Sequence, residues 1–219
     1  MDQSKSLSVR EELASIVLRL RSKGLCDVAL IAALEQTPRR SFVHAQWVDI
    51  AYKNTVIPIE CGEYIERLDE QLMVISALNL AKKHRVLEVG TGSGYTTALM
   101  ARLAGRVTTM ERYKQLCDLA RQRFHQLKLD NIVLRQMDGS RAISGSGPFD
   151  RIVMWCSMPE EPQQFLDLLS SEGTLIAAIG PNDASQTLVR YVKTGSRFER
   201  MDMFKVRFQP FIEGVSAKL

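Results

Sequence analysis

The sequence predicts an α/β fold: a doubly wound, mostly parallel, Rossmann-like sheet of about seven strands with helices on both faces, preceded by an N-terminal helical subdomain. Three observations predict this class. Short apolar runs alternate with stretches of helical periodicity from Val86 onward, as in βαβ units. A glycine-rich turn, Gly90–Gly94, follows the first run, and acidic residues follow the second and third. We expect residues 1–82 to form the helical subdomain and a loop, and residues 83–219 to form the core.

The N-terminal part is expected to be helical because apolar residues recur there at helical spacing. Gly24 divides this pattern into two helices, and Pro38 ends the second. A third apolar cluster follows at residues 42–52. Residues 54–64 contain β-branched residues, proline and glycine and are expected to be extended or looped, and a further helix is expected over Asp69–Ala81.

The core is expected to consist of strands and helices in alternation, with right-handed crossovers between the parallel strands. The runs expected as parallel strands are Val86–Val89, Val107–Met110, Ile132–Leu134, Ile152–Trp155 and Leu175–Ile179. The helices expected between them are Thr96–Leu103, Tyr113–Leu127 and Glu161–Leu169. Two further β-rich runs, Thr187–Val192 and Met203–Phe208, flank the turn-prone Thr194–Ser196 and are expected to form a hairpin that closes one edge of the sheet.

Composition and charge argue against several classes of protein. The 219 residues carry a formal net charge of +4, but Lys and Arg are scattered, which indicates a solvated surface and no nucleic-acid partner. The four cysteines lie far apart, without a CxxC pair, so we expect neither a metal site nor a disulfide framework. No secretory signal and no apolar run of membrane-spanning length is visible, so we expect a cytoplasmic protein without a membrane partner.

The first strand of the core is expected to lead into a tight turn, Gly90-Thr91-Gly92-Ser93-Gly94, and then into a helix that begins near Tyr95. Glycines allow positive φ and the close approach of a ligand. The first N–H groups of the helix have no partners within it and can meet the polar groups of a cofactor. By itself this turn is a weak signal, because such turns also occur for purely structural reasons.

Two acidic residues strengthen the prediction of a cofactor site. Glu111 ends the second strand, and Asp138 follows the third. In isolation each predicts no more than a helix cap or a solvated loop residue. The carboxyl ends of parallel strands meet at one edge of a sheet, so the turn and both acids are expected to converge on one crevice. There Glu111 can accept hydrogen bonds from ribose hydroxyls and Asp138 from an adenine amino group, which predicts a nucleoside cofactor.

The kind of nucleoside cofactor follows from the details of the turn. Gly94-Tyr95-Thr96 lacks the lysine of a phosphate-binding P-loop, and the turn is shorter than the G-x-G-x-x-G of nicotinamide enzymes. Glu88, just before the turn, would repel a pyrophosphate but suits a zwitterionic methionyl group. These features favour S-adenosylmethionine as the cofactor, with S-adenosylhomocysteine as its product and no metal.

The run Val86–Tyr95, Val-Leu-Glu-Val-Gly-Thr-Gly-Ser-Gly-Tyr, resembles motif I of the protein-L-isoaspartate O-methyltransferase family. The likeness extends along nearly the whole chain. The other segments that carry it are Leu20-Arg21, Gly24-Leu25, Ala33-Leu34, Pro38-Arg39, Phe42-Val43, Ala51-Tyr52, Ile57-Pro58-Ile59 through Gly62, Pro148–Ile152 and Val206–Pro210. Motif I with this tyrosine ending is specific to methyltransferases, and its combination with the N-terminal helices is specific to this family.

The resemblance implies an S-adenosylmethionine-dependent O-methyltransferase that acts in protein repair by methylating the free carboxylate of an L-isoaspartyl residue. Residues 83–219 would then be the cofactor-binding core. The resemblance places Glu111 at the ribose hydroxyls and Asp138 with Gly139 at the adenine. The expected cofactor-binding residues are Glu88, Gly90, Thr91, Gly92, Ser93, Gly94, Tyr95, Glu111, Arg112, Asp138 and Gly139.

The chain departs from the family on the side of the methyl acceptor. The family's Gly-Gln-Thr-Ile-Ser-Gln-Pro corresponds without a gap to Gly62-Glu63-Tyr64-Ile65-Glu66-Arg67-Leu68, so its active-site serine falls on Glu66 and its proline on Leu68. After the fourth strand, Thr-Ala-Ala-Ala-Pro becomes Trp155-Cys156-Ser157-Met158-Pro159, whose first and fourth residues are much larger than those they replace. The family's aspartate after Ala-Tyr-x is Asn54.

Glu66 and Arg67 are the candidate catalytic residues. An ionised glutamate would repel an isoaspartyl carboxylate by about 4 kcal/mol at contact in an effective dielectric of about 20, and Arg67 could cancel that repulsion. One hypothesis is that Glu66 acts as a general base on a hydroxyl, phenol or amine of a small-molecule acceptor. The alternative is that Glu66 is a solvated loop residue and isoaspartyl activity is retained or has been lost.

These alternatives leave the partner of the chain open. It is either an isoaspartyl-containing protein or peptide, or a small-molecule acceptor. A chain that has lost catalysis would be a cofactor-binding homologue without enzyme activity. The sequence is compatible with both a monomer and a dimer.

Overall fold

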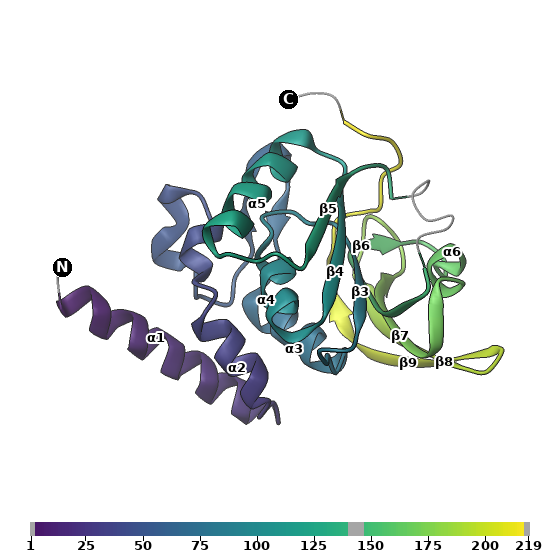
Figure 1. Ribbon diagram of the computed structural model, residues 1–219, viewed down its shortest axis with the longest axis horizontal. Helices are drawn as coiled ribbons and strands as arrows, with labels where there is room; N and C mark the ends of the chain where they lie inside the picture. Colours follow the sequence, from purple (N-terminus) through teal and green to yellow (C-terminus); the bar gives the residue numbers. More distant parts are fainter. Residues whose placement is uncertain (1–2, 140–146, 217–219) are drawn as a thin grey trace.

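The computed structural model describes residues 3–139 and 147–216 (Figure 1). Its centre is a seven-stranded sheet with the strand order β5-β4-β3-β6-β7-β8-β9. The strands are β3 (Arg85–Val89), β4 (Arg106–Glu111), β5 (Ile132–Gln136), β6 (Phe149–Met158), β7 (Leu169–Ile179), β8 (Gln186–Thr194) and β9 (Arg197–Val206). Strands β3 to β7 are mutually parallel, and β8 and β9 are antiparallel. The predicted fold class is confirmed.

The order of the strands determines where a ligand can bind. Strand β3 lies between β4 and β6, and the chain continues outward from β3 in one direction through β4 and β5, then returns to β6 on the other side. Such a reversal leaves a crevice outside the carboxyl end of the first strand, which in this chain is the end that leads into the glycine-rich turn.

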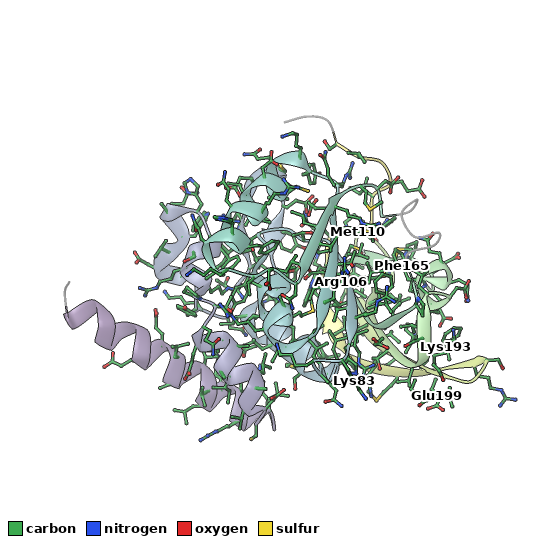
Figure 2. The ribbon with its side chains drawn as sticks, viewed as in Figure 1. Lys83, Arg106, Met110, Phe165, Lys193 and Glu199 are labelled. Carbon is green, nitrogen blue, oxygen red and sulfur yellow. The ribbon has the colours of Figure 1, made fainter. Side chains whose placement is uncertain are left out.

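Alternate residues of the central strands pack into two hydrophobic layers. Val86, Val107 and Val153 belong to the layer beneath α3 (Leu68–Ala77), α4 (Tyr95–Leu103) and α5 (Lys114–Gln126). Leu87 and Ile152 belong to the layer beneath α6 (Gln163–Leu166), on the opposite face of the sheet. Figure 1 shows α3, α4 and α5 on one side of the sheet and α6 on the other. In Figure 2, Met110 and Phe165 mark the second layer, and Lys193 and Glu199 mark the β8–β9 hairpin.

The N-terminal part is helical, as predicted. It consists of α1 (Gln3–Ser22), α2 (Val28–Glu35) and two 3-10 helices, η1 (Arg39–Phe42) and η2 (Ala45–Ile50). Asp69, in the first turn of α3, ties α1 to the body of the molecule, because its carboxylate accepts from Arg19 at 2.9 Å and from Lys23 at 2.7 Å. The predicted division after residue 82 falls just before β3, and one hydrophobic cluster continues across it from Ile16 to Phe208.

Several predicted boundaries differ from the structure for identifiable reasons. The helix predicted over Glu161–Leu169 is reduced to α6, because Pro162 caps its start and Leu169 already belongs to β7. The helix predicted over Asp69–Ala81 ends at Ala77, since Asn79 adopts a positive φ of 47°. The third apolar cluster, at residues 42–52, begins at the end of η1 and includes η2.

The segment predicted as extended or looped before α3 forms a small two-stranded structure. Strand β1 (Ile57–Pro58) pairs antiparallel with β2 (Tyr64–Ile65), and the short 3-10 helix η3 (Glu60–Gly62) joins them. We refer to residues 57–66 as the strap. Across residues 3–139 and 147–216, no helix combines the length and the apolar character that crossing a membrane requires.

Candidate functional site

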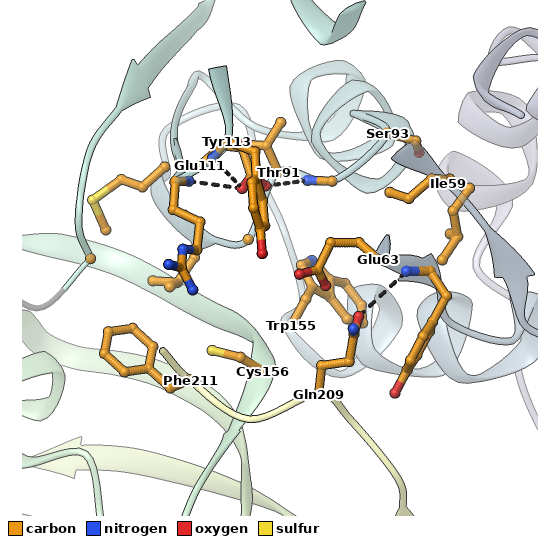
Figure 3. A pocket seen from close by; sticks show the side chains of 18 of the residues that line it. Ile59, Glu63, Thr91, Ser93, Glu111, Tyr113, Trp155, Cys156, Gln209 and Phe211 are labelled. Atoms are coloured by element: carbon orange, nitrogen blue, oxygen red, sulfur yellow. Dashed lines mark hydrogen bonds between the residues drawn. The ribbon is translucent and has the colours of Figure 1, made fainter. Parts of the chain in front are cut away.

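A pocket opens at the carboxyl ends of β3 and β4 and beside the later part of β6, where the crevice was expected. The space within it, which includes the part open to solvent, is about 860 Å³. The strap and residues 209–212 form the opposite wall. Figure 3 shows Thr91 and Glu111 on one side of this space, Glu63 beside Gln209 on another, and Phe211 at one end.

The glycine-rich turn forms part of the pocket wall because its backbone is held by the neighbouring strand. The N–H groups of Gly90 and Thr91 both donate to the carbonyl of Met110, at 2.9 and 3.1 Å. Gly90 and Gly92 have φ values of 91° and 53°, a region that glycine adopts without strain. Both line the pocket, so the turn presents bare backbone to a ligand.

The third glycine of the turn has a packing role. Gly94 has a φ of 86°, and a Cβ added there would lie 2.8 Å from Cε1 of Phe124 in α5. Gly94 is therefore required for the close packing of the turn against α5, and it is not among the described residues that line the pocket.

Glu111 is fixed at the pocket wall by backbone donors. Its carboxylate accepts from the N–H groups of Gly92 at 2.9 Å, Arg112 at 2.8 Å and Tyr113 at 3.1 Å. Burial raises the pKa of Glu111, and these hydrogen bonds act in the opposite direction. Each carboxylate oxygen can accept more than one hydrogen bond, so Glu111 remains able to receive hydroxyl groups from a ligand.

Glu88 lies beneath the turn, and it is not among the described lining residues. Its fully buried carboxylate accepts from the hydroxyls of Thr96 at 2.6 Å, Thr97, and Thr109 at 2.8 Å, and from Nε1 of Trp155 at 2.9 Å. Four donors satisfy both of its oxygens. The structure therefore places Glu88 as a support for the turn and for the Trp155 wall, behind the surface that a cofactor would touch.

Two other residues expected to bind the cofactor also lie behind the pocket surface. Tyr95 is buried against the N-terminal helices, with its ring centroid 5.4 Å from that of Phe42. Asp138 accepts from the N–H of Gly214 at 2.8 Å and so anchors the C-terminal segment. Its neighbour Gly139 does line the pocket, and a Cβ added there would lie 3.1 Å from the ring of Phe211.

On the acceptor side, the structure brings Glu66 into the pocket but not Arg67. Glu66 is 7% exposed, and burial raises the pKa of its carboxyl to about 8. It is therefore not the solvated loop residue that one interpretation of the sequence proposed. Arg67 has a side chain that is 48% exposed and pairs with Glu70 at 3.2 Å, outside the described lining residues. Arg67 is not in a position to neutralise Glu66.

The residues that do contact Glu66 were not identified from the sequence. Arg39 is completely buried, and its Nη2 donates to the backbone carbonyl of Glu66 at 2.9 Å. Gln71 Nε2 donates to Oε2 of Glu66 at 3.5 Å. The only sequence signal for Arg39 was its place in the Pro-Arg-x-x-Phe-Val match, which does not reveal its contacts.

The strap is held against the C-terminal segment at the mouth of the pocket. The N–H of Tyr64 donates to Oε1 of Gln209 at 3.4 Å, and the Tyr64 hydroxyl donates to the carbonyl of Arg207 at 3.1 Å. Glu63 also lines the pocket. The pKa of Glu63 is raised, mainly by burial and to a smaller extent by the nearby charge of Glu111. Glu63 and Tyr64 depart from the family sequence, and nothing in the sequence predicts that the strap contacts residues 207–209.

Comparisons with known proteins identify the family of the chain. A family model described as protein-L-isoaspartate(D-aspartate) O-methyltransferase matches residues 11–216. The chain belongs to this family. A protein-L-isoaspartate O-methyltransferase from Rhizobium meliloti is 41% identical over 93% of this chain and 100% of that protein. One from Xanthobacter autotrophicus is 37% identical over the full length of both.

Solved structures agree with the family assignment. A Plasmodium falciparum protein described as a protein-L-isoaspartate O-methyltransferase, in complex with S-adenosyl-L-homocysteine, has a TM-score of 0.78 and 25% identity, covering 90% of this chain and 97% of that one. Another structure of that name has a TM-score of 0.81 at 21% identity, covering 93% of this chain and 67% of that chain, and supports the fold alone.

Membership of the family confirms three predictions made from the sequence: the family itself, the enzyme class and the cofactor. The chain is an S-adenosylmethionine-dependent methyltransferase of the protein-L-isoaspartate O-methyltransferase family. The roles of individual residues remain predictions. Within the part of the chain that the structure covers, no group of three or more His, Cys, Asp or Glu residues is arranged to hold a metal ion.

Proposed function

We propose that this protein transfers the methyl group of S-adenosylmethionine to the free carboxylate of an L-isoaspartyl residue in a protein or peptide. Its family membership supports this acceptor. The observation that carries the proposal is the burial of Glu66, the residue at the position of the family's serine. Burial raises the pKa of Glu66 to about 8, so at pH 7 the Glu66 carboxyl is uncharged in most of the protein molecules. The repulsion expected of an ionised glutamate is then largely absent.

The pocket residues fit the cofactor. The bare backbone of the turn allows close approach, Glu111 offers acceptor oxygens for ribose hydroxyls, and Met137 and Phe211 add apolar wall for a flat base. We propose that the residues that contact the cofactor are Gly90, Thr91, Gly92, Ser93, Glu111, Arg112 and Gly139, all of which line the pocket. Glu88, Gly94, Tyr95 and Asp138 hold these residues in place from behind.

The reaction requires little of the protein beyond alignment of the acceptor carboxylate with the methyl group. S-adenosylmethionine supplies a methyl group activated by its bond to a positively charged sulfur. An isoaspartyl carboxylate is already ionised at neutral pH, so no residue has to remove a proton from it. The contribution of the protein is then to hold the acceptor carboxylate in line and to exclude water, which accounts for the enclosed position of Glu66 and Trp155.

The acceptor is tested with a pair of peptides of identical sequence, one with an L-isoaspartyl residue and one with the ordinary aspartyl residue, and radiolabelled S-adenosylmethionine. We expect base-labile methyl label on the isoaspartyl peptide and at least a hundredfold less on the aspartyl peptide. This ratio corresponds to about 2.7 kcal/mol of discrimination. Equal labelling of the two, or no labelling while S-adenosylhomocysteine still raises the melting temperature, would overturn the proposed acceptor.

We also propose a reducing cytoplasm as the compartment. All four cysteines are free, and Cys156 lines the pocket. Oxidation of a thiol in that wall would add bulk where the acceptor has to enter. Disulfide-free proteins with several thiols are typical of reducing compartments.

A further inference from the structure

Three buried glutamates, Glu66, Glu88 and Glu111, lie in or under the pocket, and the donors to their carboxyl groups differ. Glu88 accepts from four side-chain donors, and Glu111 accepts from three backbone N–H groups. Glu66 is just as enclosed, but the one side-chain donor that reaches it from the described residues is the amide of Gln71, at 3.5 Å. A buried carboxylate anion is stable only with strong, close donors. Glu66 lacks them, so its surroundings favour the neutral acid.

The nearest cation, Arg39, does not change this conclusion, because its guanidinium hydrogen bonds go to other groups and its buried Nε has no hydrogen-bond partner among the described residues. Arg39 donates through Nη2 to the backbone carbonyl of Glu66 at 2.9 Å and through Nη1 to Oε1 of Gln71. Its guanidinium is also packed against the ring of Tyr95, 4.9 Å from the centroid. No Arg39 hydrogen bond reaches the Glu66 carboxyl.

The contact between Arg39 and Gln71 determines how Gln71 presents its amide to Glu66. Arginine has only donors, so the Gln71 atom that faces it must be the carbonyl oxygen. The Gln71 NH₂ group therefore points the other way and donates to Oε2 of Glu66. With Oε2 engaged as an acceptor, the proton of the neutral acid belongs on Oε1. No donor from another described side chain contacts Oε1.

The other groups that face Glu66 leave it close to a neutral environment. The charged groups are Arg39 from η1 and Glu70 from α3, one of each sign. Tyr64 from the strap and Cys156 from β6 also face it, and burial raises the pKa of both side chains, so both are uncharged at pH 7. The backbone N–H of Glu66 itself also reaches the carboxyl.

We propose that Glu66 works as a neutral acid, whose Oε1–H donates a hydrogen bond to the carboxylate of the methyl acceptor, and that Arg39 and Gln71 are positioning residues that orient it. This inference rests on the proposed isoaspartyl acceptor. A hydroxyl of serine and a protonated carboxyl both offer one O–H donor, so a glutamate can replace the family's serine while it remains protonated. The proton stays on Glu66 throughout, because the acceptor is ionised from the start.

The proposal predicts a specific pH dependence. Deprotonation removes the donor and places a like charge beside the acceptor carboxylate, so kcat/KM for an isoaspartyl peptide falls as Glu66 ionises. Given its pKa of about 8, the wild-type kcat/KM should fall about tenfold between pH 7 and pH 9. Glu66→Gln keeps a donor that does not ionise, so its kcat/KM should be the same at the two pH values. Because the cofactor and peptide are identical in both assays, their own titrations cancel in the comparison.

Two further variants keep the test decisive if Glu66→Gln folds poorly. Glu66→Ser carries the family's hydroxyl and should also lose the alkaline fall. Gln71→Met removes the amide that stabilises the anion at Oε2, so the fall should move to higher pH, whereas general damage to the scaffold would lower kcat/KM equally at every pH. An alkaline fall that persists unchanged in Glu66→Gln or Glu66→Ser would overturn the proposal, as would a flat wild-type profile. Failure of the proposed function is distinct, since the wild type would then label no isoaspartyl peptide at any pH.

Discussion

Nε1 of Trp155 donates a hydrogen bond to Oε1 of Glu88 at 2.9 Å, and this bond joins the acceptor wall of the pocket to the support beneath the glycine-rich turn. Trp155 stands where the family has a small residue, and Glu88 belongs to motif I. One side chain therefore contributes both to the shape of the acceptor space and to the satisfaction of a fully buried carboxylate.

Replacing Trp155 by phenylalanine tests this link. The variant keeps an aromatic ring but leaves the Glu88 carboxylate with one donor fewer, so we expect a loss of about 1–3 kcal/mol in the free energy of unfolding, measured in urea. The substitution should also raise KM for the isoaspartyl peptide, because the smaller ring changes the shape of the acceptor wall. Thr97→Val is the matched control: it removes another donor of Glu88 from outside the pocket lining, so it should cost similar stability with KM unchanged. An unchanged KM in Trp155→Phe would contradict a role for the ring in the acceptor wall.

Gly94 is expected to tolerate alanine far less well than Gly24. Both have strongly positive φ, 86° and 78°, but a Cβ meets Phe124 at 2.8 Å at the first position and nothing within 4 Å at the second. The backbone strain of about 1–2 kcal/mol is shared, while only Gly94→Ala adds overpacking of about 1–3 kcal/mol. Urea unfolding of the two variants measures the difference, and equal losses would show that the contact with Phe124 relaxes without cost.

Glu111→Gln should weaken cofactor binding. The carboxylate receives three backbone N–H groups, and an amide has one oxygen with which to do so, leaving its NH₂ opposed to a donor. We expect S-adenosylhomocysteine to bind about 10- to 100-fold more weakly in calorimetric titration, the equivalent of about 1.4–2.8 kcal/mol. Unaltered affinity would remove Glu111 from the proposed cofactor site.

Arg67, a candidate catalytic residue from the sequence, is expected to be dispensable. It is not among the described residues that line the pocket, and it pairs with Glu70 in a partly exposed salt bridge, a kind that contributes little to stability. Arg67→Ala should therefore change kcat/KM for the isoaspartyl peptide by no more than about twofold, a shift of about 0.4 kcal/mol. A loss of tenfold or more would return Arg67 to the catalytic group.

The sheet and the turn could be predicted from the sequence because both are local patterns. The apolar run that forms β3, the glycines after it, and the acid at the end of β4 need no knowledge of distant contacts, since parallel strands bring their carboxyl ends together. Which residues of motif I line the pocket and which support it from behind could not be predicted in this way. Glu88, Gly94 and Tyr95 share the motif with pocket residues but face its supporting side, and only the packing of α5 and the N-terminal helices shows this.

The surroundings of Glu66 also depend on tertiary packing. Arg39 reaches Glu66 across 27 positions of the chain, because η1 packs against the start of α3. From the sequence alone, Arg67 is the expected partner of Glu66, because it follows Glu66 directly and its positive charge could neutralise the carboxylate. The fold instead places Arg67 toward solvent and buries Glu66 beside Arg39, whose hydrogen bonds go to Gln71 and to the backbone carbonyl of Glu66 and not to its carboxyl.

The burial of Glu66 should also be visible in the stability of the protein. Its pKa in the folded state, about 8, lies above the ordinary glutamate value of 4.5, so the folded state binds this proton more tightly than the unfolded state. The stabilisation is complete below pH 4.5 and is lost as the pH rises to about 8. Near pH 7 this loss amounts to about 3 kcal/mol relative to a group that stays neutral. Glu66→Gln stays neutral, so its free energy of unfolding should rise relative to wild type between pH 5 and pH 8. Urea unfolding of both proteins at these two pH values without cofactor measures the change, and a difference that is independent of pH would show that Glu66 is ionised throughout.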